Sequence, residues 1–371
     1  MPRPNFVQCA ERAFRPLVEV SGRLDLAPKL KTKALPPALA PEQFQRFKDL
    51  RALDFEPIFL PNGGFLYPYK LGERACLALS SYSGQDKIEQ QLASWLDENS
   101  ATFEPVDPAT FLFLAYHAYG YIRLQSEFQT ALGAESVIDI IRADYVGHDV
   151  FDIIEYYQPI YIITFDETSV FSDIQPYILA TELLSMVGDL RSLIVDREFS
   201  NAVHQLLQYP SIDAEKLFLT LTSTRWRYAF LELYRCIEAV LFLPWILDLR
   251  LALPATCTLR DGYSKIRSTL GWRENKAESI QRLFDKLEGD PALVDAEIGV
   301  NQFIDLVNTE DFKRRWVGRR INKIRNMLVH HEDFDDGEVL DVSESEFRHL
   351  CLYMTRVIAT ICARYDEELR A

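Results

Sequence analysis

The chain has 371 residues and a formal net charge of -15, with 48% hydrophobic and 26% charged residues. This length allows two domains that each bury a core, and the composition is typical of globular protein and excludes wholesale disorder. The most apolar run, residues 239–247, is too short to span a bilayer, so we expect no membrane partner.

Cysteine usage and the N-terminus bear on localisation and on metal binding. The first residues contain no apolar run of signal-peptide length. The six cysteines are scattered, with no CxxC pair and no Cys/His cluster at zinc spacing. We therefore expect a cytoplasmic protein with reduced thiols, no metal site and no cofactor.

Residues 1–40 are basic and contain several prolines, each of which restricts its own backbone and that of the preceding residue. We predict an arm or linker with little helix. A helix is expected over residues 41–53, with Pro41 in its first turn. Residues 55–81 should form β structure, because the Asn62-Gly63 turn signal separates two strand patterns.

Residues 41–210 are predicted to form a mixed α+β domain. Its further expected elements are helices over residues 86–98, 110–132, 176–195 and 198–207 and a buried strand over residues 160–165. Acidic residues far outnumber basic ones between residues 97 and 173, so this region should repel a phosphate backbone. We interpret the domain as a sensor or regulatory domain.

Residues 211–371 show the periodicity of long helices and are predicted to form an all-α bundle. The expected helices cover residues 213–243, ending or kinking at Pro244, and residues 264–270, 276–287, 291–307 and 312–330. The last helix is the clearest, because Ser343 and Glu346 have capping-box spacing ahead of an apolar stripe.

Residues 313–331, KRRWVGRRINKIRNMLVHH, are strongly basic in an acidic chain. On a helix, the core stripe would contain Val317, Ile321, Ile324 and Leu328, and the polar strip on the far side would contain Arg319, Asn322, Asn326 and His330. Arg325 and His330 would lie roughly 140° apart around the helix axis. They would converge only if the helix ends near His330 or if two copies of it pack together.

The sequence RNMLVH at residues 325–330 resembles the R-x4-6-H motif of the HEPN superfamily. The sequence FLELYRCIEA at residues 230–239 is similar to an early helix of HEPN bundles, particularly those of the ApeA-like group. The resemblance covers residues 213–369 and does not extend to the N-terminal half. It implies an HEPN-like helical bundle in the C-terminal half.

The resemblance also implies metal-independent RNA cleavage by a homodimer with a composite cleft. Arg325 would stabilise the negative charge that develops on the phosphorane, because a guanidinium can bind it bidentately without losing its own proton. His330 would act as acid or base near neutral pH, and His331 also satisfies the spacing. Asn326 would orient the phosphate or the imidazole ring. The RNA backbone would be held by Arg315, Arg319, Arg320 and Lys323.

Proteins of this superfamily often serve as bacterial toxins or anti-phage effectors. The resemblance therefore implies such a role. On that hypothesis the N-terminal domain, which is acidic and lacks catalytic spacing, would be a sensor or brake that responds to a protein or ligand trigger. The competing hypothesis is a non-catalytic module that binds RNA, a nucleotide or a protein partner. For the basic segment alone, a surface helix with histidines at its C-terminal end is the simpler interpretation, because positive charge there suits the helix dipole.

Glu238 lies in an apolar stretch, where a carboxylate requires a partner. Arg325, at the edge of its core stripe, and Arg235, on the same helix, are the two candidates. Glu238 is therefore a candidate supporting residue of the site. The acidic loop at residues 332–346 shows no EF-hand order, so we expect a solvated loop rather than a metal site.

Overall fold

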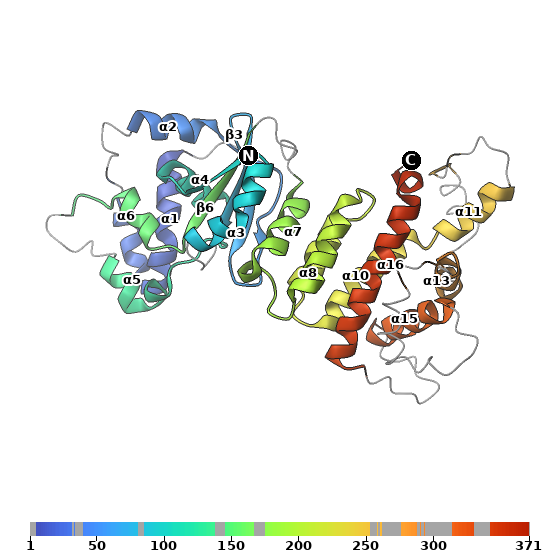
Figure 1. Cartoon of the computed structure of the whole chain (residues 1–371). Coiled ribbons are helices and arrows are strands. Elements are labelled where there is room, and N and C mark those ends of the chain that lie inside the picture. The colour runs from blue at the N-terminus through green and yellow to red at the C-terminus, as the bar shows by residue number, and fades with distance from the viewer. Residues whose placement is uncertain are drawn as a thin grey trace. The chain divides into compact units, whose positions relative to one another are not determined.

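The computed structural model describes residues 5–31, 33, 40–80, 85–137, 145–166, 175–252, 258, 260–261, 276–287, 290, 293, 314–329 and 342–370. The chain divides into two compact units, Met1–Arg191 and Ser192–Ala371 (Figure 1). The first unit contains helices and an antiparallel sheet, whereas the elements described in the second unit are all helices. This arrangement agrees with the predicted order of an α+β half followed by a helical half.

The first unit begins with α1 (Phe6–Ser21), so the prediction of an arm with little helix was wrong. Asn5 and Gln8 form a capping box, in which each side chain accepts a hydrogen bond from the other residue's backbone N–H, at 2.9 and 3.1 Å. The buried face of α1 contains Cys9, Ala10, Ala13, Phe14, Leu17 and Val18. Packing of this face outweighs the cost of Pro16 within the helix.

A six-stranded antiparallel sheet follows α2 (Ala40–Asp49). Its strands are β1 (Leu50–Ala52), β2 (Ile58–Phe59), β3 (Phe65–Leu71), β4 (Arg74–Ser80), β5 (Ala101–Pro105) and β6 (Ile160–Phe165). Their order is β1-β3-β4-β6-β5, and β2 pairs with β3. The predicted turn thus joins β2 to β3. Gly64 is required there because a Cβ would lie 2.0 Å from the carbonyl oxygen of Ser80.

Helices cover both faces of this sheet. Successive side chains on a strand point to opposite faces, so each strand can contribute to a core on either side. Tyr67 and Tyr69 of β3 contact the ring of Phe113 in α4 (Pro108–His117) and share a core with α1. On the other face, Phe165 of β6 contacts Trp95 of α3 (Gln85–Glu98). Figure 1 shows α1 and α4 on one side of the sheet and α3 and α7 (Pro176–Met186) on the other.

The helix predicted over residues 110–132 is shorter than expected, since α4 ends at His117. Gly120 adopts φ 91°, a conformation that glycine reaches at little cost, and the aromatic sequence continues as a turn. The elements that follow this turn are η2 (Ser126–Gln129), α5 (Ala131–Val137) and α6 (Val150–Glu155). His117 is partly buried and packs on Phe113 with ring centroids 4.5 Å apart, and this burial lowers its pKa.

The second unit includes residues that the sequence assigned to the N-terminal domain. Its described helices are α8 (Arg197–His204), η4 (Gln205–Gln208), α9 (Ala214–Thr222), α10 (Trp226–Val240), α11 (Leu243–Ala252), α13 (Lys276–Asp285), α15 (Arg314–Val329) and α16 (Glu344–Arg370). The guanidinium of Arg348 on α16 pairs with Asp196 and Glu198, which attaches α8 to the helical unit. The boundary therefore falls after residue 191, whereas the sequence placed it after residue 210.

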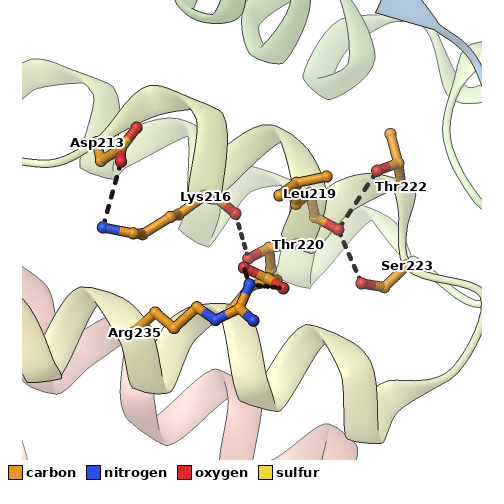
Figure 2. Close-up of polar contacts among 8 residues, drawn as sticks. Asp213, Lys216, Leu219, Thr220, Thr222, Ser223 and Arg235 are labelled. Carbon is orange, nitrogen blue, oxygen red and sulfur yellow. Dashed lines mark hydrogen bonds and ion pairs between the residues drawn. The ribbon is translucent and has the colours of Figure 1, made fainter.

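The single helix predicted over residues 213–243 is two helices, α9 and α10. The hydroxyls of Thr222 and Ser223 donate to the carbonyl oxygen of Leu219, at 3.3 and 2.8 Å, and α9 ends there (Figure 2). Such side chains compete with the helical hydrogen bonds of the backbone. Pro244 does not end a helix but lies in the first turn of α11, where its missing N–H costs nothing.

The capping box predicted for the last helix is confirmed. The Ser343 N–H donates to the Glu346 carboxylate at 2.6 Å, and the Glu346 N–H donates to the Ser343 hydroxyl at 3.3 Å. The helices predicted at residues 264–270 and 291–307 lie outside the described residues, apart from Leu293. Among the residues that the structure does describe, no helix is long and apolar enough to cross a membrane.

Replacement of Leu17 by alanine tests whether α1 is an integral part of the first unit. Leu17 is 0% exposed, so the variant loses buried surface and leaves a cavity. We expect the free energy of unfolding to fall by about 2–5 kcal/mol, measured by urea denaturation.

The matched control is Val7→Ala on the same helix, because Val7 is 56% exposed. It should change the free energy of unfolding by no more than about 0.5 kcal/mol. Equal, small effects of both substitutions would show that α1 does not pack on the unit.

Candidate functional site

The basic helix α15 packs through the apolar stripe that the sequence predicted. Val317, Ile321 and Ile324 are fully buried, and Leu328 is half-buried. Gly318 brings α15 close to α13, because a Cβ at this position would lie 2.9 Å from the ring of Phe284. The helix is therefore held on one side by a close interhelical contact.

Asn322 was predicted to lie on the exposed polar strip, and this prediction was wrong. Its side chain is only 7% exposed, and its amide oxygen accepts a hydrogen bond of 2.7 Å from the Tyr234 hydroxyl of α10. Burial, and secondly the charge of Glu238, raise the pKa of Tyr234, while Arg325 opposes this shift. Tyr234 therefore remains a neutral donor at physiological pH, and its bond joins α10 to α15.

Arg325 is held by groups from two helices. Its Nη2 lies 3.6 Å from Oε1 of Glu238, and its guanidinium carbon lies 5.6 Å from the centroid of the Tyr234 ring. Its Nη1 donates to the side-chain oxygen of Asn326 at 3.1 Å. The side chain is 18% exposed. A guanidinium with contacts on several sides is restricted to few rotamers, so its direction is largely set by α10.

The predicted pairing of Glu238 with Arg325 is therefore confirmed. The alternative partner, Arg235, instead donates to Glu232 at 2.7 Å. Arg235 is labelled in Figure 2, where dashed lines mark its contacts with this carboxylate. Although Arg235 is closer to Glu238 in sequence, the helix directs it toward Glu232, three residues earlier.

Lys276 of α13 is a member of the cluster that the sequence did not reveal. Its Nζ donates to Oε1 of Glu238 at 2.7 Å, the same oxygen that faces Arg325. The Lys276 and Glu238 side chains are 41% and 24% exposed. No spacing rule links a residue of α13 to one of α10, so only the packing of the two helices could reveal the pair. We call Tyr234, Glu238, Lys276, Asn322 and Arg325 the Glu238 cluster.

The other predicted site residues divide into two groups. Arg319, Lys323 and Asn326 are exposed on α15, and Arg320 is half-exposed. The side chain of Arg315, together with His330 and His331, lies outside the described residues, as does most of the acidic loop that follows. The structure thus brings Arg325 together with Glu238, and the predicted convergence of Arg325 with a histidine stays a prediction.

The described part of the chain also bears on two further chemistries, metal binding and nucleophilic attack by a thiol. No group of three or more His, Cys, Asp and Glu residues there is arranged to hold a metal ion. Cys236 and Cys362 line a cavity of about 50 Å³ beside α10, and burial raises the pKa of Cys236 to about 12. Its thiol therefore stays protonated at neutral pH and is a poor nucleophile.

Comparison of the chain with models of protein families, with characterised proteins and with solved structures finds no match.

Replacement of Tyr234 by phenylalanine tests the bond between α10 and α15. The variant keeps the ring beneath Arg325 but leaves the buried Asn322 oxygen without its donor. We expect the free energy of unfolding to fall by about 1–3 kcal/mol, measured by chemical denaturation. Tyr228→Phe is the control, because Tyr228 lies on the same helix and is half-exposed. An equal effect of the two substitutions would contradict a stabilising Tyr234–Asn322 bond.

Proposed function

We propose that the helical unit is a metal-independent RNA endonuclease of the HEPN type. The observation that carries the proposal is the placement of Arg325, the first residue of the R-x4-H spacing. Its guanidinium is held against a carboxylate and an aromatic ring on the neighbouring helix α10. A positioned and permanently charged group is what stabilisation of a developing phosphorane requires, because it does not have to reorganise during the reaction.

In the proposed reaction the neighbouring 2′-hydroxyl attacks the phosphorus, and the 5′-oxygen of the next nucleotide leaves. His330 would accept the hydroxyl proton or supply the proton that the leaving oxygen needs, since imidazole titrates near neutral pH. His331 remains an alternative for this role. Arg325 would bind the negatively charged non-bridging oxygens, Asn326 would orient the phosphate or the imidazole ring, and Glu238 would keep Arg325 in place.

The exposed side of α15 supports the choice of RNA as substrate. Arg319 and Lys323 are exposed on this helix, and Arg320 is half-exposed. Arg315 belongs to the same helix. Cationic side chains along one helix bind a phosphate backbone without reading its sequence. Affinity would therefore fall steeply with salt, and cleavage specificity would arise elsewhere.

We further propose that the endonuclease acts as a homodimer and that it serves as a toxin or an anti-phage effector. The acidic N-terminal unit would then restrain the enzyme until a protein or ligand trigger binds. Its excess of acidic residues between residues 97 and 173 makes it unsuited to bind RNA itself. We place the regulatory role there for this reason.

Incubation of the full chain with total RNA in the presence of EDTA tests the cleavage chemistry. We expect cleavage in EDTA, and a loss on the order of 10²–10⁴-fold in Arg325→Ala and in His330→Ala. The measurement is the initial rate of fragment formation on denaturing gels. Arg356→Ala is the control, because Arg356 is exposed on α16 and outside the Glu238 cluster.

Unchanged cleavage in both site variants would remove the motif from the mechanism. Cleavage that EDTA abolishes would contradict metal-free chemistry. If RNA is not cut under any activating condition, the helical unit is a non-catalytic module that binds RNA, a nucleotide or a protein partner.

The composite cleft predicts that two copies of the chain are needed. We expect a dimer in sedimentation velocity at micromolar concentration. Mixing Arg325→Ala with His330→Ala should recover part of the lost cleavage, because a mixed dimer contains one intact Arg325 and one intact His330. An active species that sediments as a monomer would contradict the composite site.

A further inference from the structure

We propose that Lys276 and Arg325 together form a two-cation site for a single phosphate group of RNA, with Glu238 as their shared counter-ion. This inference rests on the proposed function, because it assigns a second phosphate-binding residue to the same site. Lys276 is on α13, outside the basic helix, and nothing in its own sequence context marks it as a binding residue.

The first argument is the geometry of the shared oxygen. Lys276 Nζ and Arg325 Nη2 lie 2.7 and 3.6 Å from Oε1 of Glu238. The two nitrogens are therefore no farther apart than the sum of these distances. Two non-bridging oxygens of one phosphate, each accepting a charge-assisted hydrogen bond at about 2.8 Å, can reach both nitrogens. A phosphate in this position would meet two cations at once.

The second argument is that both cations can contact a phosphate without leaving Glu238. An ammonium carries three donors and a guanidinium five, so one carboxylate oxygen engages only part of either group, even though Nη1 of Arg325 also donates to Asn326. Lys276 is 41% exposed and Arg325 is 18% exposed, so Lys276 lies nearer the solvent and Arg325 deeper in the cluster. Partial burial lowers the local dielectric constant and strengthens both the attraction of an anion to the two cations and its repulsion from the one carboxylate of Glu238, so the net effect follows from the excess of one positive charge.

A second carboxylate with two cationic neighbours provides an internal comparison. Asp248 of α11 lies 2.8 Å from Lys286 and 3.6 Å from Arg282. Arg282 also pairs with Glu278 at 2.7 Å, and none of these residues is on α15. The Asp248 group resembles the Glu238 cluster in its distances but contains a second carboxylate and lies off the basic helix. It therefore should not bind RNA, and Lys286 is the matched control for Lys276.

The test measures binding of a fluorescent 2′-O-methyl RNA oligonucleotide to the full chain. Fluorescence anisotropy gives the binding constant at each of a series of salt concentrations. This RNA has no free 2′-hydroxyl and is not cut by the proposed chemistry. We expect Lys276→Met to weaken binding by about tenfold. The negative slope of log K against log salt should become shallower by about 0.7 to 0.9, because one phosphate contact is lost. Lys276→Arg should retain most of the affinity, and Lys286→Met should bind within about twofold of wild type.

Equal binding by Lys276→Met and wild type, an equal loss in Lys286→Met, or no binding of this RNA by wild type would overturn the inference. The thermal unfolding midpoint of each variant is measured in parallel. If Lys276→Met is unfolded, Lys276→Gln replaces it, with the same expected loss of affinity and salt slope.

Failure of this inference and failure of the proposed function have different outcomes. Cleavage of ordinary RNA by wild type, with unchanged RNA binding in Lys276→Met, would remove Lys276 and leave the endonuclease. Lys276-dependent RNA binding without any cleavage would leave the phosphate site and remove the endonuclease.

Discussion

The Glu238 carboxylate lies where α10, α13 and α15 meet, and one of its oxygens faces a cation from each of the other two helices. A partly buried carboxylate is costly unless it is paired, and removal of one partner leaves the remaining charges poorly compensated. The ion pairs therefore favour one arrangement of the three helices. The Tyr234–Asn322 bond adds a neutral contact between α10 and α15 that does not depend on charge.

This arrangement connects the stability of the helical unit to the proposed chemistry. Arg325 is not an exposed side chain that would have to be ordered when RNA binds, because Glu238, Tyr234 and Asn326 already restrict it. The entropy of fixing a long side chain is lost during folding rather than during binding. The same contacts would make Glu238 a positioning residue in the proposed reaction, since it acts on the phosphate only through Arg325.

Much of the local structure was predictable from periodicity and capping. The hairpin at Asn62-Gly63, the strand β6, the helix α3 and the capping box of α16 all depend on residues close together in the chain. The predictions of secondary structure were wrong where a local signal for a loop or a helix end competed with an apolar helical pattern. Prolines near the N-terminus concealed the amphipathic α1, and the hydroxyls of Thr222 and Ser223 end α9 inside a continuous apolar pattern.

By itself the sequence determined the basic helix, its apolar stripe and the R-x4-H spacing, because these follow from the order of side chains on one helix. Only the tertiary structure decided that Asn322 is buried, that Glu238 faces Arg325 rather than Arg235, and that Lys276 joins them. Each of these facts depends on how helices distant in sequence pack and rotate against one another, and helical periodicity within one segment does not contain that information.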